Sequence, residues 1–372
     1  MINMELKKTP FYQKHLENKA KIVNFGGWAL PVEYQGSLAE ARITRGGCGL
    51  FDASHMGEIV VKGEGALDFL QSLTPNDISA VSFGHQQYNL FLNETGGVID
   101  DLMVYVRKED FYCVVNAVNK DKVLNWLVRR KPEGVDVIDE SSFTGLLCLQ
   151  GPQSEKVIDS VFGERISSLS YMRFKETDFL NQKILISRSG YTGEDGFELY
   201  CQSEVSSKLW DALTANNCDV SVTPCGLGAR DILRIEAGYP LYGHELDEHI
   251  SPLEASLDWV IKFNKDFIAK DILFDIKMKT ANQKRVGFVM IDKSVPRQGY
   301  LIYCHGKVVG KVSSGTFSPN LSKFIGMAFI DREFSLVSGV VDIEIRGKFY
   351  KAEVTKYPFL SLGRKKTIKS GK

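Results

Sequence analysis

The side chains best suited to chemistry lie in two glycine-rich segments in the second half of the sequence. The first, 189–199, reads Ser-Gly-Tyr-Thr-Gly-Glu-Asp-Gly-Phe-Glu-Leu and contains Tyr191 and Glu198. The second, 226–238, contains Arg230. A carboxylate, an aromatic ring and a guanidinium therefore lie on backbone that glycine allows to turn tightly. We expect these segments to build a polar pocket for an organic ligand.

Glu198 lies in a predicted strand, where successive side chains point to opposite faces. Phe197 and Leu199 would face a core, which leaves Glu198 and Tyr200 on the other face. If that face lines a cavity, the carboxylate can accept two parallel hydrogen bonds from an amidine-like edge, such as a pterin or a guanine presents. An exposed glutamate on an edge strand is the alternative, and the residues alone leave both open.

Arg230 and Arg234 are one helical turn apart and follow the Gly-Leu-Gly of 226–228. Both can project from one face near the start of a helix, and either can bind a ligand carboxylate through two hydrogen bonds. The alternative for each is a salt bridge with Asp231 or Glu236.

Two adjacent carboxylates, Asp100 and Asp101, lie in a predicted strand that follows a Gly-Gly turn. Asp101 shares a face with Met103 and Tyr105, and Asp100 lies on the opposite face. One of the two aspartates is therefore expected to be buried or to face a cavity, where carboxylates are rare unless paired or functional. The alternative is a turn-capping aspartate beside a surface one.

Several common chemistries lack their sequence signals. His244 and His249 are five residues apart, about 140° around a helix, whereas a zinc-binding HExxH pair needs a spacing of four on one face. Neither a glycine-rich dinucleotide motif, a P-loop nor a GxSxG elbow occurs. We expect no metal site, and no nicotinamide, ATP or serine-hydrolase chemistry.

Composition is typical of a globular protein that is long enough for two or three compact units, with 372 residues, 44% hydrophobic and 25% charged. The formal net charge of +0 gives no field that attracts nucleic acid. The one dense basic run, 364–372, is interpreted as a solvated tail. No apolar run has membrane-spanning length. We therefore expect neither nucleic acid nor a membrane as a partner.

Cysteine usage bears on the compartment. The seven cysteines are odd in number and never reach CxxC spacing, which favours reduced thiols in a cytoplasm or an organellar matrix. The first 21 residues lack both an apolar core and any arginine, unlike secretory signals and mitochondrial presequences. A bacterial cytoplasmic protein is the simplest interpretation, and a mature organellar chain remains the alternative.

Two textures divide the chain. Residues 1–270 alternate strand-like and amphipathic helical segments, an α+β pattern. After a polar linker at 277–284, the remainder, 283–372, has short strands and turn signals that predict a β-barrel or sandwich. The predicted strands are 58–62, 99–106, 111–116 and 197–201, the predicted helices are 66–73, 120–130, 153–162 and 205–215, and a hairpin turning at Gly347-Lys348 joins strands 341–345 and 349–355.

Taken together, these segments resemble the T-protein of the glycine cleavage system, the tetrahydrofolate-dependent aminomethyltransferase. The resemblance runs nearly end to end. Besides the two segments first described, it rests on FGGWALP at 25–31, GLFDASHMG at 49–57, GGVIDD at 96–101, LQGP at 149–152, YGHELDE at 242–248, NKDFI at 264–268 and SSGTFSP at 313–319.

The resemblance implies a three-domain cloverleaf around a central folate channel, with two interleaved N-terminal α+β domains and a C-terminal β-barrel. It implies that the lipoylated H-protein presents an aminomethyl group on sulfur, and that the one-carbon unit passes to tetrahydrofolate as a co-substrate. The products are 5,10-methylenetetrahydrofolate, ammonia and dihydrolipoyl H-protein. The implied partners are H-protein and the other components of the glycine cleavage system.

The resemblance also implies roles for single residues. The family's essential aspartate falls on Asp101, beside the reactive folate nitrogens, where it would orient them and stabilise developing positive charge. The pterin contact falls on Glu198, a ligand-binding guanidinium on Arg230, and a backbone contact near the folate on Met56. The expected polar and aromatic lining is Tyr88, Tyr105, Asn116, Tyr191 and Trp259.

One departure concerns the C-terminus. Many relatives end in a Lys-Pro-Pro-Phe-Val-Arg type of segment, whereas residues 356–364 here read Lys-Tyr-Pro-Phe-Leu-Ser-Leu-Gly-Arg. The arginine that meets the folate glutamate tail then falls on Arg364.

Two rival functions remain open from the sequence. One is another folate-dependent methyltransferase or demethylase on the same scaffold, which would share the Glu198 pocket but require no lipoyl partner. The other is a non-catalytic folate-binding accessory protein, whose relatives carry a Lys-Gly-Cys-Tyr type of motif. That motif does not occur, and Asp101 is retained, which favours catalysis.

Overall fold

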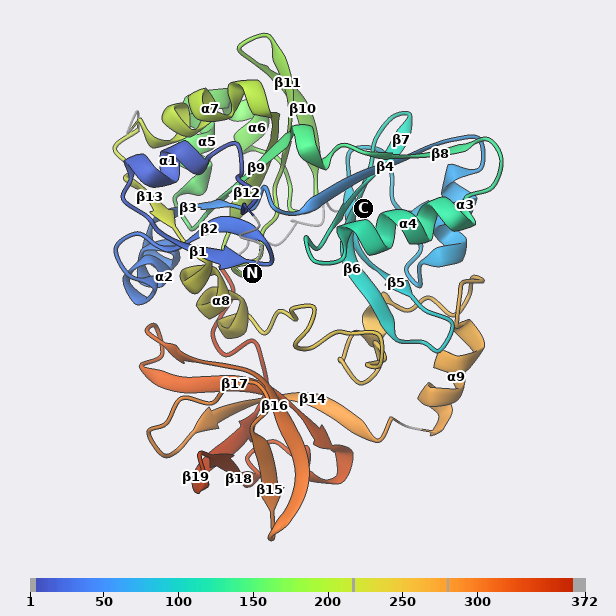
Figure 1. Ribbon diagram of the computed structural model, residues 1–372, viewed down its shortest axis with the longest axis vertical. Helices are drawn as coiled ribbons and strands as arrows, with labels where there is room; N and C mark the ends of the chain where they lie inside the picture. Colours follow the sequence, from blue (N-terminus) through green and yellow to red (C-terminus); the bar gives the residue numbers. More distant parts are fainter. Residues whose placement is uncertain (1–4, 216–217, 280, 364–372) are drawn as a thin grey trace, which may run out of the picture.

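The computed structural model describes residues 5–215, 218–279 and 281–363. Figure 1 shows three lobes, two of them α+β and the third a barrel at the C-terminal end of the chain. Within the described residues, no helix is long and apolar enough to cross a membrane. Short 3-10 turns occur at Ile78–Ala80, Ser141–Phe143, Ser203–Val205, Asp258–Val260 and Arg332–Phe334.

The first lobe contains a six-stranded sheet in the order β10-β11-β12-β9-β3-β13, and a separate hairpin, β1-β2. Helices α5, α6 and α7 cover one face of the sheet, and α2 and α8 lie toward the barrel (Figure 1). The strands are β1 (Lys21–Phe25), β2 (Trp28–Glu33), β3 (Cys48–Asp52), β9 (Thr144–Gln150), β10 (Phe174–Phe179), β11 (Gln182–Ser187), β12 (Gly196–Gln202) and β13 (Val222–Cys225). The helices are α1 (Tyr12–Glu17), α2 (Ser37–Gly46), α5 (Ser154–Phe162), α6 (Glu164–Ser167), α7 (Ser206–Thr214) and α8 (Leu227–Glu236).

The second lobe is inserted between β3 and β9 of the first. Its sheet has the order β5-β6-β7-β4-β8, with all pairings antiparallel. The strands are β4 (Gly57–Gly63), β5 (Gln86–Leu92), β6 (Val98–Val106), β7 (Asp110–Val115) and β8 (Val135–Asp139), and the helices are α3 (Ala66–Leu73) and α4 (Lys120–Arg130). Because the chain returns to β9 after β8, the two N-terminal domains are interleaved, as the resemblance implied.

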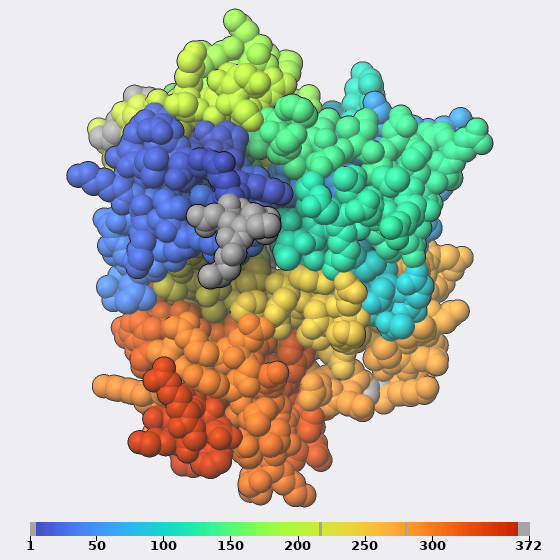
Figure 2. Space-filling model, in the orientation of Figure 1, coloured from blue at the N-terminus to red at the C-terminus, as the bar shows by residue number. Residues whose placement is uncertain are grey.

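The third lobe is a closed six-stranded barrel in the order β14-β17-β16-β15-β18-β19. A long connection that contains α9 (Lys270–Lys279) leads into it, and Figure 2 shows part of this connection, in yellow, lying between the barrel and the second lobe. The strands are β14 (Gln283–Met290), β15 (Leu301–Cys304), β16 (Lys307–Ser318), β17 (Lys323–Asp331), β18 (Val340–Ile345) and β19 (Lys348–Thr355).

The elements expected from periodicity all form, with their bounds shifted by at most two residues. The β18–β19 turn is centred one residue earlier than expected, on Arg346 and Gly347, which have φ angles of 53° and 76°. Two successive positive φ angles give the turn the twist that suits a two-residue hairpin.

A shared hydrophobic core joins the two N-terminal sheets. Tyr105 and Tyr112 of the second lobe pack there against Leu146 and Tyr200 of the first. The ring of Tyr105 meets that of Tyr200 edge-on at 5.5 Å between centroids. The two sheets therefore face each other, so that side chains from both can meet in one site.

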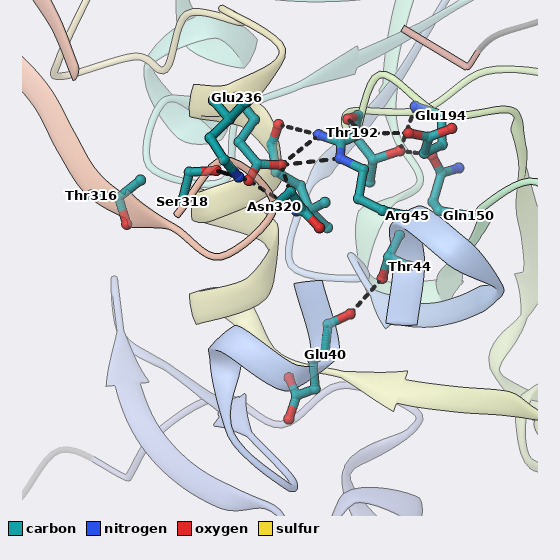
Figure 3. A network of polar contacts seen from close by, with 12 residues as sticks. Glu40, Thr44, Arg45, Gln150, Thr192, Glu194, Glu236, Thr316, Ser318 and Asn320 are labelled. Carbon is teal, nitrogen blue, oxygen red and sulfur yellow. Dashed lines mark hydrogen bonds and ion pairs between the residues drawn. The ribbon is translucent and has the colours of Figure 1, made fainter. Parts of the chain in front are cut away.

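A polar network fixes the barrel to the first lobe (Figure 3). The Arg45 side chain binds both Glu194 and Glu236, with N–O distances of 2.8 and 3.0 Å. Glu236 in turn accepts hydrogen bonds from Ser318 at 2.5 Å and from Asn320 at 2.9 Å, both from the barrel side. Since Arg45 and both carboxylates are at least nine-tenths buried, this network holds α2, the segment after Gly190 and α8 in one arrangement.

Candidate functional site

The aspartate pair lies where β6 begins, just after a β-bulge. Asp100 lies opposite Phe91 and Val98 opposite Leu92, so Ile99 is the additional residue. Ahead of it, Gly97 has no room for a side chain, because a Cβ there would lie 1.9 Å from the carbonyl oxygen of Glu248. The glycine turn and the bulge together fix which way each aspartate points.

Asp100 is fully buried and is surrounded by N–H donors. It accepts hydrogen bonds from the backbone N–H and the side-chain amide of Asn116, at 2.9 and 2.8 Å, and from the Asn119 amide at 2.6 Å. Burial raises the pKa of Asp100, and the neighbouring charge of Asp101 raises it further. The three N–H contacts oppose this shift because they favour the charged form.

Asp101 is only partly buried and faces the first lobe. It accepts a hydrogen bond from the Tyr88 hydroxyl at 3.0 Å and another from the Asn116 amide at 2.7 Å. Burial raises the pKa of Asp101, while these two hydrogen bonds act in the opposite direction. Asn116 thus contacts both carboxylates and sets their mutual position.

Glu198 lies on the facing sheet, at the centre of a row of cross-strand neighbours. Its Oε2 accepts hydrogen bonds from Ser189 at 2.7 Å and from the Tyr105 hydroxyl at 3.2 Å. The contact recorded for Oε1 is the thiol of Cys148 at 4.0 Å, a weak donor. Glu198 and Tyr200 share a face, as alternation predicted, and one carboxylate oxygen retains most of its accepting capacity.

Tyr105 was expected among the lining residues, but it is fully buried. Its hydroxyl lies 2.9 Å from the Tyr200 hydroxyl and 3.1 Å from Ser187 Oγ, in addition to its bond to Glu198. Tyr105 comes from β6 and the other three come from the first lobe, so this network connects the two sheets. The residue therefore positions Glu198 rather than lining an open surface.

The two arginines of α8 have different surroundings. Arg234 is buried and binds Asp231 at 2.8 Å, Glu245 at 3.0 Å and Ser314 of the barrel at 2.8 Å. The salt-bridge interpretation is thus the right one for Arg234, which is structural, and ligand binding by it was the wrong one. Arg230 has no ion pair with any described residue, and its guanidinium lies 4.8 Å above the ring of Tyr191.

The remaining aromatic residues surround the same region. Tyr88 stacks on Trp259 at 5.7 Å and 25°, and Trp259 is 55% exposed. Tyr191 stacks on Tyr239 at 5.7 Å, and its hydroxyl donates to the carbonyl of Pro240. Asp101 and Arg230 both influence the pKa of Tyr191, which burial raises above its ordinary value.

Two expected site residues need separate mention. Met56 is half-buried, directly before β4, and packs against the core shared by the two sheets. Arg364 lies outside the described residues.

Several residues near the site were missed by sequence reasoning. Asn119 precedes α4 and has the residue type of a helix cap, yet its side chain makes no cap hydrogen bond and binds Asp100 instead. Ser189 and Ser187 surround Glu198, and only the inclusion of Ser189 in the glycine-rich segment pointed to them.

Of the possible zinc ligands, His244 is engaged through Nδ1 with the carbonyl of Ser313 at 2.9 Å. Within the described residues, no group of three or more potential metal ligands is found.

Two interleaved α+β domains each contribute a carboxylate to their interface, and a barrel forms the third domain. This arrangement defines a class of three-domain enzymes. Comparison with known proteins specifies the family. Residues 11–265 match the model of the GCVT N-terminal domain, and residues 283–360 match the glycine cleavage T-protein C-terminal barrel domain. The chain belongs to the glycine cleavage T-protein family.

Individual relatives agree over almost the whole chain. The aminomethyltransferase of Bacillus subtilis (strain 168) is 43% identical over 95% of this chain and 99% of its own. That of Geobacillus sp. (strain WCH70) is 44% identical over 95% of this chain and 98% of its own. The crystal structure of the glycine cleavage system aminomethyltransferase T from Bartonella henselae superposes with a TM-score of 0.91 and 32% identity, covering 97% of this chain and 100% of that one.

These matches confirm the resemblance, the α+β fold with its C-terminal barrel, and the assignment as an enzyme of the aminomethyltransferase class.

Proposed function

We propose that this enzyme transfers the one-carbon unit from the S-aminomethyl-dihydrolipoyl arm of H-protein to tetrahydrofolate. The products are 5,10-methylenetetrahydrofolate, ammonia and dihydrolipoyl H-protein. The observation that carries the proposal is the position of Asp101, held by Tyr88 and Asn116 on the sheet that faces Glu198.

The reaction moves protons between groups, but it neither takes up nor releases protons overall. The two folate nitrogens that receive the carbon each lose a proton, while the departing amine and the sulfur of the arm each gain one. A carboxylate with a raised pKa, at the place of reaction, can accept and return such a proton near neutral pH. Asp101 is the carboxylate proposed for this role, because burial raises its pKa and its face is open toward the first lobe.

Asp101 also supplies negative charge where positive charge develops on the aminomethyl carbon as ammonia leaves. Preorganised charge in a water-poor site contributes on the order of 3 kcal/mol to such a step. Asn116 and Tyr88 hold the carboxylate before the substrate arrives, so no reorganisation is needed during the reaction.

Glu198 is proposed to bind the pterin end of the folate. Oε2 is already held by Ser189 and Tyr105, and among the described residues Oε1 has the Cys148 thiol at 4.0 Å as its partner. A fixed carboxylate with accepting capacity left suits the adjacent N–H donors of a pterin. Tyr105, which binds Glu198, is four residues from Asp101 on the same face of β6, a separation of about 13 Å along an extended strand. A ligand that contacts the carboxylates of both Asp101 and Glu198 therefore has to be elongated.

Arg230 is proposed to bind the folate as well. Its guanidinium has no ion pair with any described residue and lies over Tyr191, which supports a role toward a ligand anion or carbonyl. Trp259, Tyr88 and Tyr191 then provide stacking surfaces, Met56 a backbone contact, and Arg364 the contact to the glutamate tail.

The proposed partners are lipoylated H-protein and, through it, the other components of the glycine cleavage system. A cytoplasmic location is proposed because all seven cysteines are free and the named relatives are bacterial.

Ammonia release from aminomethylated H-protein, with and without tetrahydrofolate, tests the proposal. Folate-dependent release supports it. Methyl transfer from a small amine or sulfonium donor, without H-protein, would favour the rival demethylase. Folate binding with no turnover of any donor would favour an accessory protein.

A further inference from the structure

Gln150 is a buried polar residue to which the proposed mechanism gives no role. It is the last residue of β9, belongs to the LQGP motif and is 1% exposed. The strand register places Gln150 opposite Gly196, and Cys148 opposite Glu198. Since residues directly opposite each other, and residues two apart on one strand, share a face of the sheet, Gln150 lies on the face that carries Glu198.

The amide of Gln150 binds the glycine-rich segment at two points. Its Nε2 donates to the carbonyl of Ser189 at 3.0 Å, and its Oε1 accepts from the Thr192 hydroxyl at 2.8 Å. Figure 3 shows Gln150 and Thr192 beside Glu194 and Arg45. One buried side chain therefore connects both ends of the stretch 189–192 to the end of β9.

The backbone of 189–194 has few other restraints. These residues form neither a helix nor a strand, and among the residues that the structure describes no backbone-to-backbone hydrogen bond involves them. Side chains hold the segment instead: Arg45 donates to the carbonyl of Thr192 at 2.7 Å, and Gln150 adds its two bonds. Because a segment without a backbone ladder has many accessible conformations, the bonds to Gln150 help to select one.

Two glycines of the segment leave room for the Gln150 amide. A Cβ at Gly190 would lie 1.9 Å from Gln150 Oε1, and a Cβ at Gly196 would lie 2.4 Å from its Nε2. Neither glycine has a positive φ angle, whereas Gly193 has one of 83°, so a strained backbone does not explain them. The space that the Gln150 amide occupies does, which indicates that this side chain and the segment are matched.

The stretch held by Gln150 carries two groups of the proposed folate site. The Ser189 hydroxyl donates to Glu198 Oε2 at 2.7 Å. The ring of Tyr191 lies 4.8 Å from the guanidinium of Arg230. A shift of the backbone at 189–192 would move both groups, so Gln150 can affect ligand binding without contacting the ligand.

We propose that Gln150 is a positioning residue for tetrahydrofolate binding: its amide fixes 189–192 so that Ser189 orients the Glu198 carboxylate and Tyr191 supports Arg230. The inference rests on the proposed function and deepens it. It gives the LQGP motif a role in recognition of the co-substrate. It gives the motif no role in the chemistry, because Asp101 is on β6 of the other sheet.

Gln150→Met tests the proposal, because methionine has a similar length and volume and makes neither hydrogen bond. We expect the KM for tetrahydrofolate, measured by ammonia release from aminomethylated H-protein, to rise at least about tenfold, with a matching loss of affinity in calorimetry. The kcat at saturating tetrahydrofolate should stay within about threefold, since the bonds of Asp101 to Tyr88 and Asn116 are unchanged.

The division between KM and kcat separates positioning from a purely structural role. Removal of a residue that only stabilises the fold would lower the folded fraction, so the apparent kcat and the unfolding midpoint would fall while KM and the dissociation constant stayed the same. That pattern would overturn the proposal. Ser206→Ala is the matched control, because it removes a hydrogen bond of a buried hydroxyl at the start of α7, and it should leave KM unchanged.

Thr192→Val provides a second test that does not depend on recovering folded Gln150→Met. It removes the hydroxyl that donates to Gln150 and leaves the bond to Ser189 in place. We expect a smaller rise in the dissociation constant of tetrahydrofolate, and a rise in the double variant no greater than that of Gln150→Met alone, because both changes act through one contact. Additive effects would contradict this route.

The wild type separates this inference from the proposed function. Unchanged dissociation constants in both single variants, with a wild type that binds tetrahydrofolate, contradict the inference alone. A wild-type protein that does not bind tetrahydrofolate contradicts the proposed function together with it.

Discussion

The sharpest test of the carboxylate pair is Asp101→Asn, which keeps the shape of the side chain and removes its charge. The new amide can still accept from Asn116 through its oxygen and donate to the Tyr88 hydroxyl, because that hydroxyl lies 3.0 Å away and can also act as an acceptor. We therefore expect a folded protein that still binds tetrahydrofolate through Glu198 and Arg230.

Turnover should fall strongly in this variant. A preorganised charge that stabilises the transition state contributes on the order of 3 kcal/mol, which corresponds to about a hundredfold in rate. Ammonia release from aminomethylated H-protein in the presence of tetrahydrofolate measures it, with Asp178→Asn as a control, since Asp178 is exposed on β10. Near-normal turnover by Asp101→Asn would refute the assignment of the reaction to this carboxylate.

The same substitution changes how stability depends on pH. In the wild type, burial and the Asp101 charge raise the pKa of Asp100 above its unfolded value. The folded state therefore retains a proton that the unfolded state releases, and stability declines as the pH rises from about 4 through the folded pKa. Asp101→Asn removes the second cause, so the decline should be shallower and end at a lower pH.

The magnitude follows from linkage. Each unit by which the pKa of Asp100 falls restores about 1.4 kcal/mol at a pH above that pKa. Urea unfolding between about pH 3 and 9 compares the two proteins, because this range spans the ordinary and raised values of a carboxyl pKa. Identical pH profiles would show that the two carboxylates do not interact.

Four further substitutions test the surrounding residues. Glu198→Gln should weaken tetrahydrofolate binding about tenfold or more in calorimetry, because an amide presents one acceptor where the pterin edge needs two; an unchanged dissociation constant would remove Glu198 from the site. Tyr105→Phe leaves the hydroxyls of Ser187 and Tyr200 without their shared partner, so the free energy of unfolding should fall by about 1 to 3 kcal/mol in urea titrations. Arg234→Met should cost about 3 to 5 kcal/mol because it leaves Glu245 buried and unpaired, whereas Arg230→Met should leave stability nearly unchanged and weaken folate binding; equal effects of the two would contradict their different roles.

Local patterns predicted the elements of the site but only part of its contacts. Alternation correctly placed Asp101 and Tyr105 on one face of β6, and Glu198 with Tyr200 on one face of β12. Periodicity is a property of neighbouring residues, so it can be seen in the sequence. It does not show that the faces of β6 and β12 meet, because that depends on the packing of two sheets.

The two arginines of α8 show the limit most clearly. Arg230 and Arg234 have the same residue type and lie on the same side of one helix, so helical spacing treats them alike. What separates them is Glu245, eleven residues further along, and Ser314 in the barrel, eighty residues away. A salt bridge built from three parts of the chain has no local signal, and for that reason sequence reasoning left ligand binding and ion pairing open for both.

One strand, β6, carries both the aspartate proposed for the chemistry and the tyrosine that binds Glu198, the residue proposed for recognition. Asp101, at the start of β6, faces the proposed place of reaction, and Tyr105, further along the same face, hydrogen-bonds the carboxylate of Glu198 on the opposite sheet. A strand within a five-stranded sheet is stiff, since it is hydrogen-bonded on both sides. The distance between the carboxylates of Asp101 and Glu198 is therefore set by the backbone of β6 and by the packing of Tyr105 against Tyr200, rather than by the conformation of a loop. Under the proposed function, the glycine-rich segment around Glu198 recognises one end of an elongated ligand, and β6, about a hundred residues upstream, determines where the other end reacts.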